Sequence, residues 1–335
     1  MVGITSYGFY VPRYRIKTEE IANRWGKKGT DISGSLGINE KAVASFDEDA
    51  LTMAYEASDM ALEHIDRKSI EGIFVGSETH PYLVNPTSTI LGEYLGIGNA
   101  YQAFDTQFAC KAATGALITG VGLVKSEMIK NHVLVVGTDK ASGKPGDPLD
   151  YSAASAAAAV TIGSRNVILE YIDSFSYSSD IPDFWRRHGQ SYPSHGGRFT
   201  GYFSHISGAV QGLLSKTGYK PSDFARAIFH MPNGKYPVKI ASSLGFNHDQ
   251  IKDSLVVTQL GNSYAACVLV GLSAVIDTVK KNDLILIASY GSGAGSDAIV
   301  FKATNKITSQ RKHFNSYIKE KKYIDYTTYL KFMGL

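Results

Sequence analysis

Apolar and polar positions follow the same order in two stretches of this chain that lie 151 residues apart. Residues 104–140 read FDTQFACKAATGALITGVGLVKSEMIKNHVLVVGTDK, and residues 255–291 read LVVTQLGNSYAACVLVGLSAVIDTVKKNDLILIASYG. In each stretch an apolar run ends in a turn, a long helix of small and aliphatic residues follows, and a β-branched strand closes the unit. Gly120 aligns with Gly271 without a gap, which is the fixed-offset sign of a duplication. The pattern predicts two related strand–helix–strand units.

Polar residues follow predicted strand ends in both halves. A weaker repeat precedes each unit, where SIEGIFVGSETH resembles DFARAIFHMPNGK. It places Glu78 and His230 just past short apolar strands. Cys110 and Asn262 occupy the turns before the two long helices. Because ligands bind at the carboxyl ends of strands in open α/β sheets, we expect these four side chains to converge.

The sequence divides into two halves and a tail. Other expected elements are helices at residues 19–25, 47–65 and 88–95 and strands at residues 73–76 and 153–163. Residues 174–203 are dense in aromatic, Gly, Pro and Arg residues, and we expect a loop and a wall of the site there rather than core. The predicted organisation is an α/β chain with halves at residues 1–166 and 167–304 and a basic, tyrosine-rich tail at residues 305–335.

Composition narrows the class of protein. The 335 residues carry a formal net charge of +3, which is too mild to favour nucleic acid but is compatible with small ligands that bear phosphate. The start MVGITSYGFYVPRYRI lacks the order of a signal peptide, and no window reaches the apolar length of a membrane span. Two cysteines make no disulfide framework. We therefore expect a cytoplasmic protein with reduced thiols, and the histidine spacing predicts no metal site.

Cys110 is the candidate nucleophile. It precedes a helix expected at residues 111–129, so its sulfur would face the free N–H groups and partial positive charge of a helix start, which stabilise a thiolate. The alternative is a small buried hydrophobe, the usual state of a free cysteine. The repeat favours the nucleophile because it places Cys110 at a turn. Cys267 lies inside the second long helix, and we interpret it as core.

Three residues are candidate partners of that thiol. His230 follows a strand and is a candidate general acid or base, although a lone histidine is more often structural. Glu78 is either a base, a helix cap or a solvated carboxylate, and its neighbour His80 competes for the role of base. Asn262 either caps the second long helix or turns its amide toward an acyl oxygen.

Glycines and lysines complete the candidate site. Gly291, Gly293 and Gly295 let the backbone approach a ligand closely and offer N–H groups to a developing oxyanion. Their cluster has no lysine and is therefore not a phosphate-binding Walker loop. Lys235 and Lys239 lie either on a solvated face or at a pocket mouth, where they would hold a phosphate.

Taken together, these motifs resemble those of the thiolase superfamily. They are FACKAATGA, HMPNGK, GNSYAA and SYGSGAGSDA, and the resemblance extends over nearly the full chain. GSETHPY, HGGRFTG and the tail phrase YIDYTTYLKF are similar to the archaeal type of 3-hydroxy-3-methylglutaryl-coenzyme A synthase. The resemblance implies a thiolase-like α/β fold, in which two duplicated halves form five layers in the order αβαβα.

The resemblance also implies a reaction. Acetyl-CoA, acetoacetyl-CoA and water would give 3-hydroxy-3-methylglutaryl-CoA and CoA, in the mevalonate route to isoprenoids and with no cofactor. Cys110 would carry the acetyl group as a thioester, Glu78 would remove a proton from it, and His230 would protonate the new alkoxide. Asn262 and backbone N–H groups near Ser292 would bind carbonyl oxygens.

Further contacts with CoA thioesters are implied for residues that match the family motifs. They are Ser152, Arg198, Thr200, Lys235 and Lys239. Two departures from the family pattern affect this region. The run SAASAAAAV replaces a usual glycine pair, and WGKKGTD lacks an acidic residue that the family often places near the adenine end.

Two other functions stay open at this point. A ketoacyl synthase III type condensing enzyme shares the Cys, His and Asn arrangement but needs no base at Glu78. A non-catalytic scaffold subunit would keep only the fold. The resemblance further implies a homodimer, and a complex with an acetoacetyl-CoA thiolase through a small zinc-ribbon and OB-fold protein. The tail would either dock in that complex or pack on its own subunit.

Overall fold

The computed structural model describes residues 1–196 and 200–334, and its main element is a nine-stranded mixed sheet. From edge to edge the strands are β5 (Gln102–Thr106), β4 (Ile70–Gly76), β6 (His132–Lys140), β7 (Ser155–Gly163), β1 (Gly3–Tyr10), β8 (Leu169–Ser178), β13 (Gly295–Ala303), β12 (Leu284–Ala288) and β11 (Phe224–Phe229). The two halves of this sheet join where Gly3 and Ile4 of β1 pair with Glu170 and Leu169 of β8. We call the five strands from β5 to β1 the first half-sheet and the other four the second half-sheet.

The two half-sheets repeat one topology. In the first, β1 pairs antiparallel with β7, β7 antiparallel with β6, and β6 parallel with β4. In the second, β8, β13, β12 and β11 pair in the same order and with the same directions. The predicted duplication is confirmed.

The repeat fails at one place. The apolar run at the start of the second unit was expected to form a strand, but it forms α10 (Val257–Leu260). Val257 and Leu260 are both buried and lie three residues apart, which is the spacing of a helical face rather than of a strand. The second half-sheet therefore has no counterpart of β5 among the described residues.

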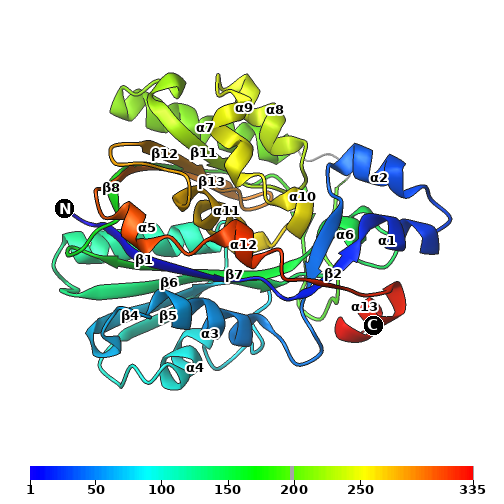
Figure 1. Cartoon of the computed structure of the whole chain (residues 1–335), viewed down its shortest axis with the longest axis horizontal. Helices are drawn as coiled ribbons and strands as arrows, with labels where there is room; N and C mark the ends of the chain where they lie inside the picture. Colours follow the sequence, from blue (N-terminus) through cyan, green and yellow to red (C-terminus); the bar gives the residue numbers. More distant parts are fainter. Residues whose placement is uncertain (197–199, 335) are drawn as a thin grey trace.

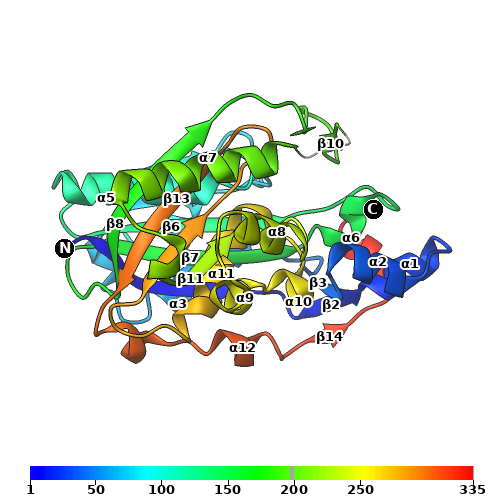
Figure 2. The ribbon, with the colours of Figure 1, turned by 90° about the horizontal axis from the view of Figure 1, so that it is seen from above.

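Helices cover both outer faces and fill the space between the half-sheets (Figure 1). They are α3 (Ala50–Ala61) and α4 (Thr87–Tyr94) on the first half-sheet, α7 (Thr200–Thr217), α8 (Tyr236–Ser243) and α9 (His248–Ile251) on the second, and α5 (Ala112–Lys125) and α11 (Cys267–Ile276) between them. Helix α11 contacts strands of both half-sheets, and all its residues, Cys267 included, are buried. Figure 2 shows α7 running along the second half-sheet. These layers follow the predicted αβαβα order.

Residues 174–203 differ from the expected loop at both ends. Residues 174–178 extend β8, and α7 begins at Thr200. Between them lies a short hairpin of β9 (Phe184–Trp185) and β10 (Ser194–His195). Alternation in FSYSS fits the end of β8, which pairs there with β13. Pro182, Gly189 and Pro193, which suggested a loop, lie between β8 and α7, whereas Gly201 lies inside α7.

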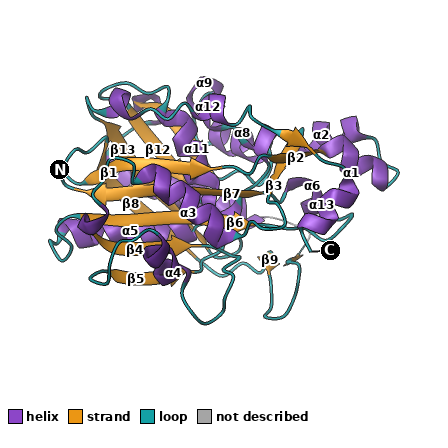
Figure 3. Cartoon of the chain, turned by 60° about the horizontal axis from the view of Figure 1, so that its bottom comes forward, coloured by secondary structure: helices purple, strands orange, loops and turns teal. Residues whose placement is uncertain are grey.

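A small lobe lies beyond one end of the half-sheets (Figure 3). It contains β14 (Lys322–Tyr323), β2 (Tyr14–Lys17), β3 (Glu40–Val43), α1 (Thr18–Arg24), α2 (Gly29–Leu36), α6 (Pro148–Ser152) and α13 (Tyr326–Phe332). Tyr326 and Tyr329 of the tail donate hydrogen bonds of 2.8 and 3.0 Å to the carboxylate of Asp150. None of the helices in the two described ranges is both long and apolar enough to cross a membrane.

The tail therefore packs on its own chain. Phe314, in the short helix α12 (Phe314–Tyr317), is completely buried, and its ring centroid lies 4.8 Å from that of Phe9 in an edge-to-face arrangement. Packing of the tail on its own subunit is confirmed, and its docking in a complex stays a prediction.

Phe314→Ala should lower the free energy of unfolding by about 3–5 kcal/mol, because it removes a buried ring and leaves a cavity against Phe9. Urea denaturation would measure the loss. Phe46→Ala is the matched control, since Phe46 is 80% exposed. Equal effects of the two substitutions would contradict the assignment of the tail to the core.

Candidate active site

A cavity of about 290 Å³ receives side chains from both halves of the chain. Cys110 and Ser152 come from the first half, and His230, Asn262 and Ser292 come from the second. The aromatic residues that line it include Phe184, Tyr202, Tyr264 and Tyr290. The expectation that residues 174–203 form a wall of the site is confirmed by Phe184 and Tyr202. Five of the residues predicted from the sequence thus share one cavity.

Cys110 lies in the turn between β5 and α5. Only 3% of the residue is exposed, yet its side chain lines the cavity. Ala109 before it has a φ of 45°, in the left-handed region that non-glycine residues rarely adopt. Backbone strain of this kind often accompanies functional turns. The sulfur of Cys110 therefore projects from a sharp, buried turn into the wall of the cavity.

Glu78 contacts the thiol directly. It follows the end of β4, and its Oε1 accepts a hydrogen bond of 3.0 Å from Cys110 Sγ. Its side chain also lines a smaller neighbouring cavity of about 20 Å³ with Arg186, and Tyr264 borders both cavities. The half-buried carboxylate is thus held beside the sulfur.

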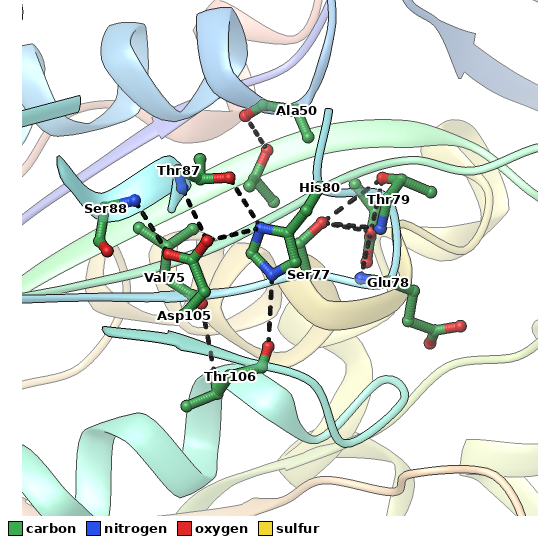
Figure 4. A network of polar contacts seen from close by, with 12 residues as sticks. Ala50, Val75, Ser77, Glu78, Thr79, His80, Thr87, Ser88, Asp105 and Thr106 are labelled. Atoms are coloured by element: carbon green, nitrogen blue, oxygen red, sulfur yellow. Dashed lines mark hydrogen bonds and ion pairs between the residues drawn. The ribbon is translucent and has the colours of Figure 1, made fainter. Parts of the chain in front are cut away.

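His80 does not compete with Glu78 for this position. Its Nδ1 lies 2.8 Å from Thr87 Oγ1, and its Nε2 lies 3.5 Å from the carbonyl oxygen of Thr106. In Figure 4 the ring lies within a network that includes Asp105, and the side chain of Glu78 points away from it. Of the two candidates for a base, Glu78 is the one beside Cys110.

Asp139, at the end of β6, holds the Glu78 turn. Its Oδ1 accepts hydrogen bonds from the hydroxyls of Ser77 and Thr79, at 2.8 and 2.7 Å, and from the N–H of Glu78 at 2.8 Å. Its Oδ2 accepts a bond of 2.8 Å from the N–H of Ala265 in the second half. One completely buried carboxylate therefore ties the turn of the base to the turn that follows Asn262.

Burial and like charge set the protonation of this group. Burial, and next the charge of Asp139, raise the pKa of Glu78 to about 8. Burial, and next the carboxylate of Glu78, raise the pKa of the Cys110 thiol well above its usual value. The expectation of a thiolate stabilised by the helix start is therefore wrong for the free protein. A neutral thiol donates to Glu78, because two carboxylates and low solvent access outweigh the helix dipole.

His230 faces the cavity from the second half. The residue is 1% exposed. Its backbone N–H donates to the carbonyl oxygen of Ala288 at 2.8 Å, and its backbone carbonyl oxygen accepts from the hydroxyl of Tyr202 at 2.7 Å. Nδ1 has no hydrogen-bond partner among the residues described. Burial lowers the pKa of the ring to about 3, so the imidazole is neutral near pH 7.

Asn262 is held by a bond within its own turn. Its Oδ1 accepts from the N–H of Tyr264 at 3.0 Å, and its backbone N–H donates to the carbonyl oxygen of Ser152 at 2.7 Å. It does not cap the following long helix, whose N-cap is Ala266. Because the side-chain oxygen is engaged, the amide NH₂ is the group left to meet a ligand.

Most of the residues predicted to contact CoA lie outside the cavity that contains Cys110. Lys235 and Lys239 are exposed and do not line the cavity, although Asn233 and Tyr236 beside Lys235 do. Thr200 is exposed at the first residue of α7. Arg198 lies outside the described residues. The roles of these residues stay predictions.

Sequence reasoning missed two residues of the site. Asp139 ends the apolar strand HVLVVGTD, so the strand-end rule that singled out Glu78 and His230 also applies to it. Tyr264 has a φ of 51°, an outlier for a bulky residue, and no feature of GNSYAA signals that conformation.

Comparisons with known proteins place the chain in a family. Residues 214–303 match the family model described as 3-oxoacyl-[acyl-carrier-protein (ACP)] synthase III C terminal. Among solved structures, an HMG-CoA synthase complexed with CoA has a TM-score of 0.92 at 22% identity, covering 99% of this chain and 90% of the other. MvaS in complex with 3-hydroxy-3-methylglutaryl coenzyme A has a TM-score of 0.93 at 21% identity, covering 100% and 92%. These likenesses confirm the thiolase-like fold.

Curated relatives found by sequence have a higher identity to this chain than these solved structures. The hydroxymethylglutaryl-CoA synthase of Archaeoglobus fulgidus is 48% identical over 99% of this chain and 98% of the relative. That of Methanocaldococcus jannaschii is 47% identical over 99% and 98%. The chain therefore belongs to the hydroxymethylglutaryl-CoA synthases, a family of condensing acyltransferases.

Proposed function

We propose that this chain condenses acetyl-CoA with acetoacetyl-CoA and water to give 3-hydroxy-3-methylglutaryl-CoA and CoA, through an acetyl group carried on Cys110. The observation that carries the proposal is the hydrogen bond of 3.0 Å between Cys110 Sγ and Glu78 Oε1 at the wall of a cavity shared by both halves. It puts a nucleophile and a base within reach of the same carbon atom.

The first step is acetyl transfer. The sulfur of Cys110 attacks the carbonyl carbon of acetyl-CoA, the bond from that carbon to the CoA sulfur breaks, and the thiol proton passes to the leaving CoA sulfur. The backbone N–H of Ser292 and the amide of Asn262 offset the charge on the oxygen during attack. The hydroxyl of Ser152 offers another contact to the acyl chains.

The second step is carbon–carbon bond formation. Glu78 takes a proton from the methyl group of acetyl-Cys110, and the enolate attacks the ketone of acetoacetyl-CoA. A carboxylate whose pKa is raised to about 8 is a stronger base than one at the surface, which favours this transfer. The N–H of the neutral His230 ring donates to the ketone oxygen and supplies the proton that the strongly basic alkoxide takes. Water then releases the product from Cys110.

The ketoacyl synthase III alternative is less well supported. Its family model matches only residues 214–303, whereas the archaeal relatives match 99% of the chain. A decarboxylating enzyme also has no use for a half-buried carboxylate hydrogen-bonded to the nucleophile. The same set of reactive residues argues against a non-catalytic scaffold.

A homodimer, bound through the first half-sheet, is part of the proposal. Strand β5 is the edge of that half-sheet, and an unpaired edge favours pairing with another chain. The nearby loop exposes Tyr82, Leu83 and Val84 by 55%, 84% and 89%. The cytoplasmic location and the complex with a thiolase and a zinc-ribbon protein stay predictions.

Mass spectrometry of the intact protein after incubation with acetyl-CoA tests the covalent step. Cys110→Ser should take up no acetyl group and should not condense, whereas Glu78→Ala should become acetylated but fail to condense. Cys267→Ser is the matched control, because this buried thiol lies in α11 and should leave acetylation intact. Normal condensation by Glu78→Ala would refute the role of Glu78.

His230→Ala should slow condensation by about 10²–10⁴-fold while acetylation of Cys110 persists, because only the second step needs a proton for the alkoxide. Single-turnover assays that start from the acetylated protein separate the two steps. A parallel loss of acetylation would contradict this division of roles.

The condensation step should respond to pH through Glu78. Its pKa is raised to about 8, so the ionised fraction grows as pH rises toward 8 and levels off above it. The rate from acetylated protein should therefore fall about tenfold for each pH unit well below that value. A flat profile between about pH 6 and pH 9 would be inconsistent with Glu78 as the base.

A further inference from the structure

Directly after the nucleophile, Lys111 forms a buried ion pair with Asp297 of β13. Its Nζ lies 3.0 Å from each carboxylate oxygen, and the two side chains are 8% and 1% exposed. The same carboxylate accepts hydrogen bonds from Thr114 Oγ1 at 2.8 Å and Ser176 Oγ at 2.7 Å. A buried ion pair loses much of its attraction to desolvation, so stability alone does not account for it.

The pair connects the two turns that meet at the site. Lys111 is the N-cap of α5 and the neighbour of Cys110 in the chain. Asp297 lies two residues after Gly295, which closes a turn with Gly291 through a hydrogen bond of 2.8 Å. A Cβ atom on Gly291 would lie 2.5 Å from the carbonyl oxygen of Phe108. The turn at residues 291–295 therefore packs directly against the backbone that precedes Cys110.

We propose that Lys111 and Asp297 are positioning residues for acetyl transfer, which hold the turn at residues 291–295 against the turn of Cys110. The inference rests on the proposed function. During attack the bond between Cys110 sulfur and the acyl carbon forms, the bond to the CoA sulfur breaks, and the thiol proton ends on the CoA thiolate. The carbonyl oxygen is negative in between. The N–H groups of Gly291, Gly293, Ala294 and Gly295 already donate to acceptors close to this turn, so the N–H of Ser292 is the donor it presents, and it reaches that oxygen only while the two turns keep their relative position.

A direct electrostatic role for Lys111 is disfavoured by its contacts. Its ammonium group is shared between both oxygens of Asp297, and it lies 4.0 Å from the centroid of the Phe108 ring. The pair is therefore neutral as a whole and offers little field to the sulfur. Its effect on the reaction must come from geometry.

The double variant Lys111→Met/Asp297→Asn tests the proposal. It removes the pair without leaving a lone buried charge, so its urea midpoint should stay close to that of the wild type. Misplacement of the oxyanion donors should slow single-turnover acetylation at saturating acetyl-CoA by about 100-fold. The KM for acetyl-CoA should change by less than about twofold, since the binding contacts remain.

Arg226→Met is the matched control, because it breaks a partly buried ion pair of 2.7 Å with Asp253 away from the cavity and should leave the acetylation rate unchanged. A double variant that acetylates at the wild-type rate would overturn the inference. So would a rate that falls only in proportion to the folded fraction. A wild-type chain that takes up no acetyl group would overturn the proposed function itself, and the two failures are therefore distinguishable.

Discussion

The hydrogen bond between the thiol of Cys110 and the carboxylate of Glu78 is the contact on which the chemistry of this protein depends. Both residues follow strands of the first half-sheet, β5 and β4, which are parallel neighbours. Parallel strands end at the same edge, so the two turns after them are adjacent by construction. The second half brings His230 to the same place from the equivalent strand β11. The duplication thus makes one site out of two copies of the same strand-end geometry.

Burial shifts the pKa values of the groups that this geometry brings together. Glu78, Asp139 and Cys110 lie together in a region of low solvent access, where two negative charges side by side are expensive. The pKa values of Glu78 and of Cys110 both rise, so near pH 7 the free site holds a neutral thiol and a Glu78 carboxyl group that is mostly protonated and ionises as pH approaches 8. The same burial keeps His230 neutral, with an N–H group to donate. Desolvation is the largest cause of the pKa shifts of all three groups, and it gives each group the protonation state that its step in the reaction needs.

The sequence predicted the parts of this site that follow from chain periodicity. Strand ends and the repeat identified Cys110, Glu78 and His230, because these positions depend on local pattern and on topology. The ionisation of Cys110 was not predictable, since it depends on Asp139 and Glu78 approaching through space. Val257 and Leu260 show the same limit in the fold, because a short apolar run is compatible with a strand until tertiary packing selects a helix. The turn of Tyr264 is held by hydrogen bonds from its own N–H to Asn262 and from the N–H of Ala265 to Asp139, and the second of these is a contact between residues distant in sequence.

A site built from two halves needs a fixed distance between them. Hydrogen bonds from the N–H groups of Glu78 and Ala265 to Asp139 hold the base to the second half, and the pair of Lys111 and Asp297 holds the nucleophile to it. Each tie is a buried polar group, and each is satisfied by several donors, which makes its geometry specific at some cost in stability. A neutral pair beside the nucleophile also leaves the charge balance of Glu78 and Cys110 untouched. At the nucleophile, positioning by Lys111 and Asp297 is in this way separated from protonation, whereas Asp139 both holds the turn of Glu78 and raises its pKa.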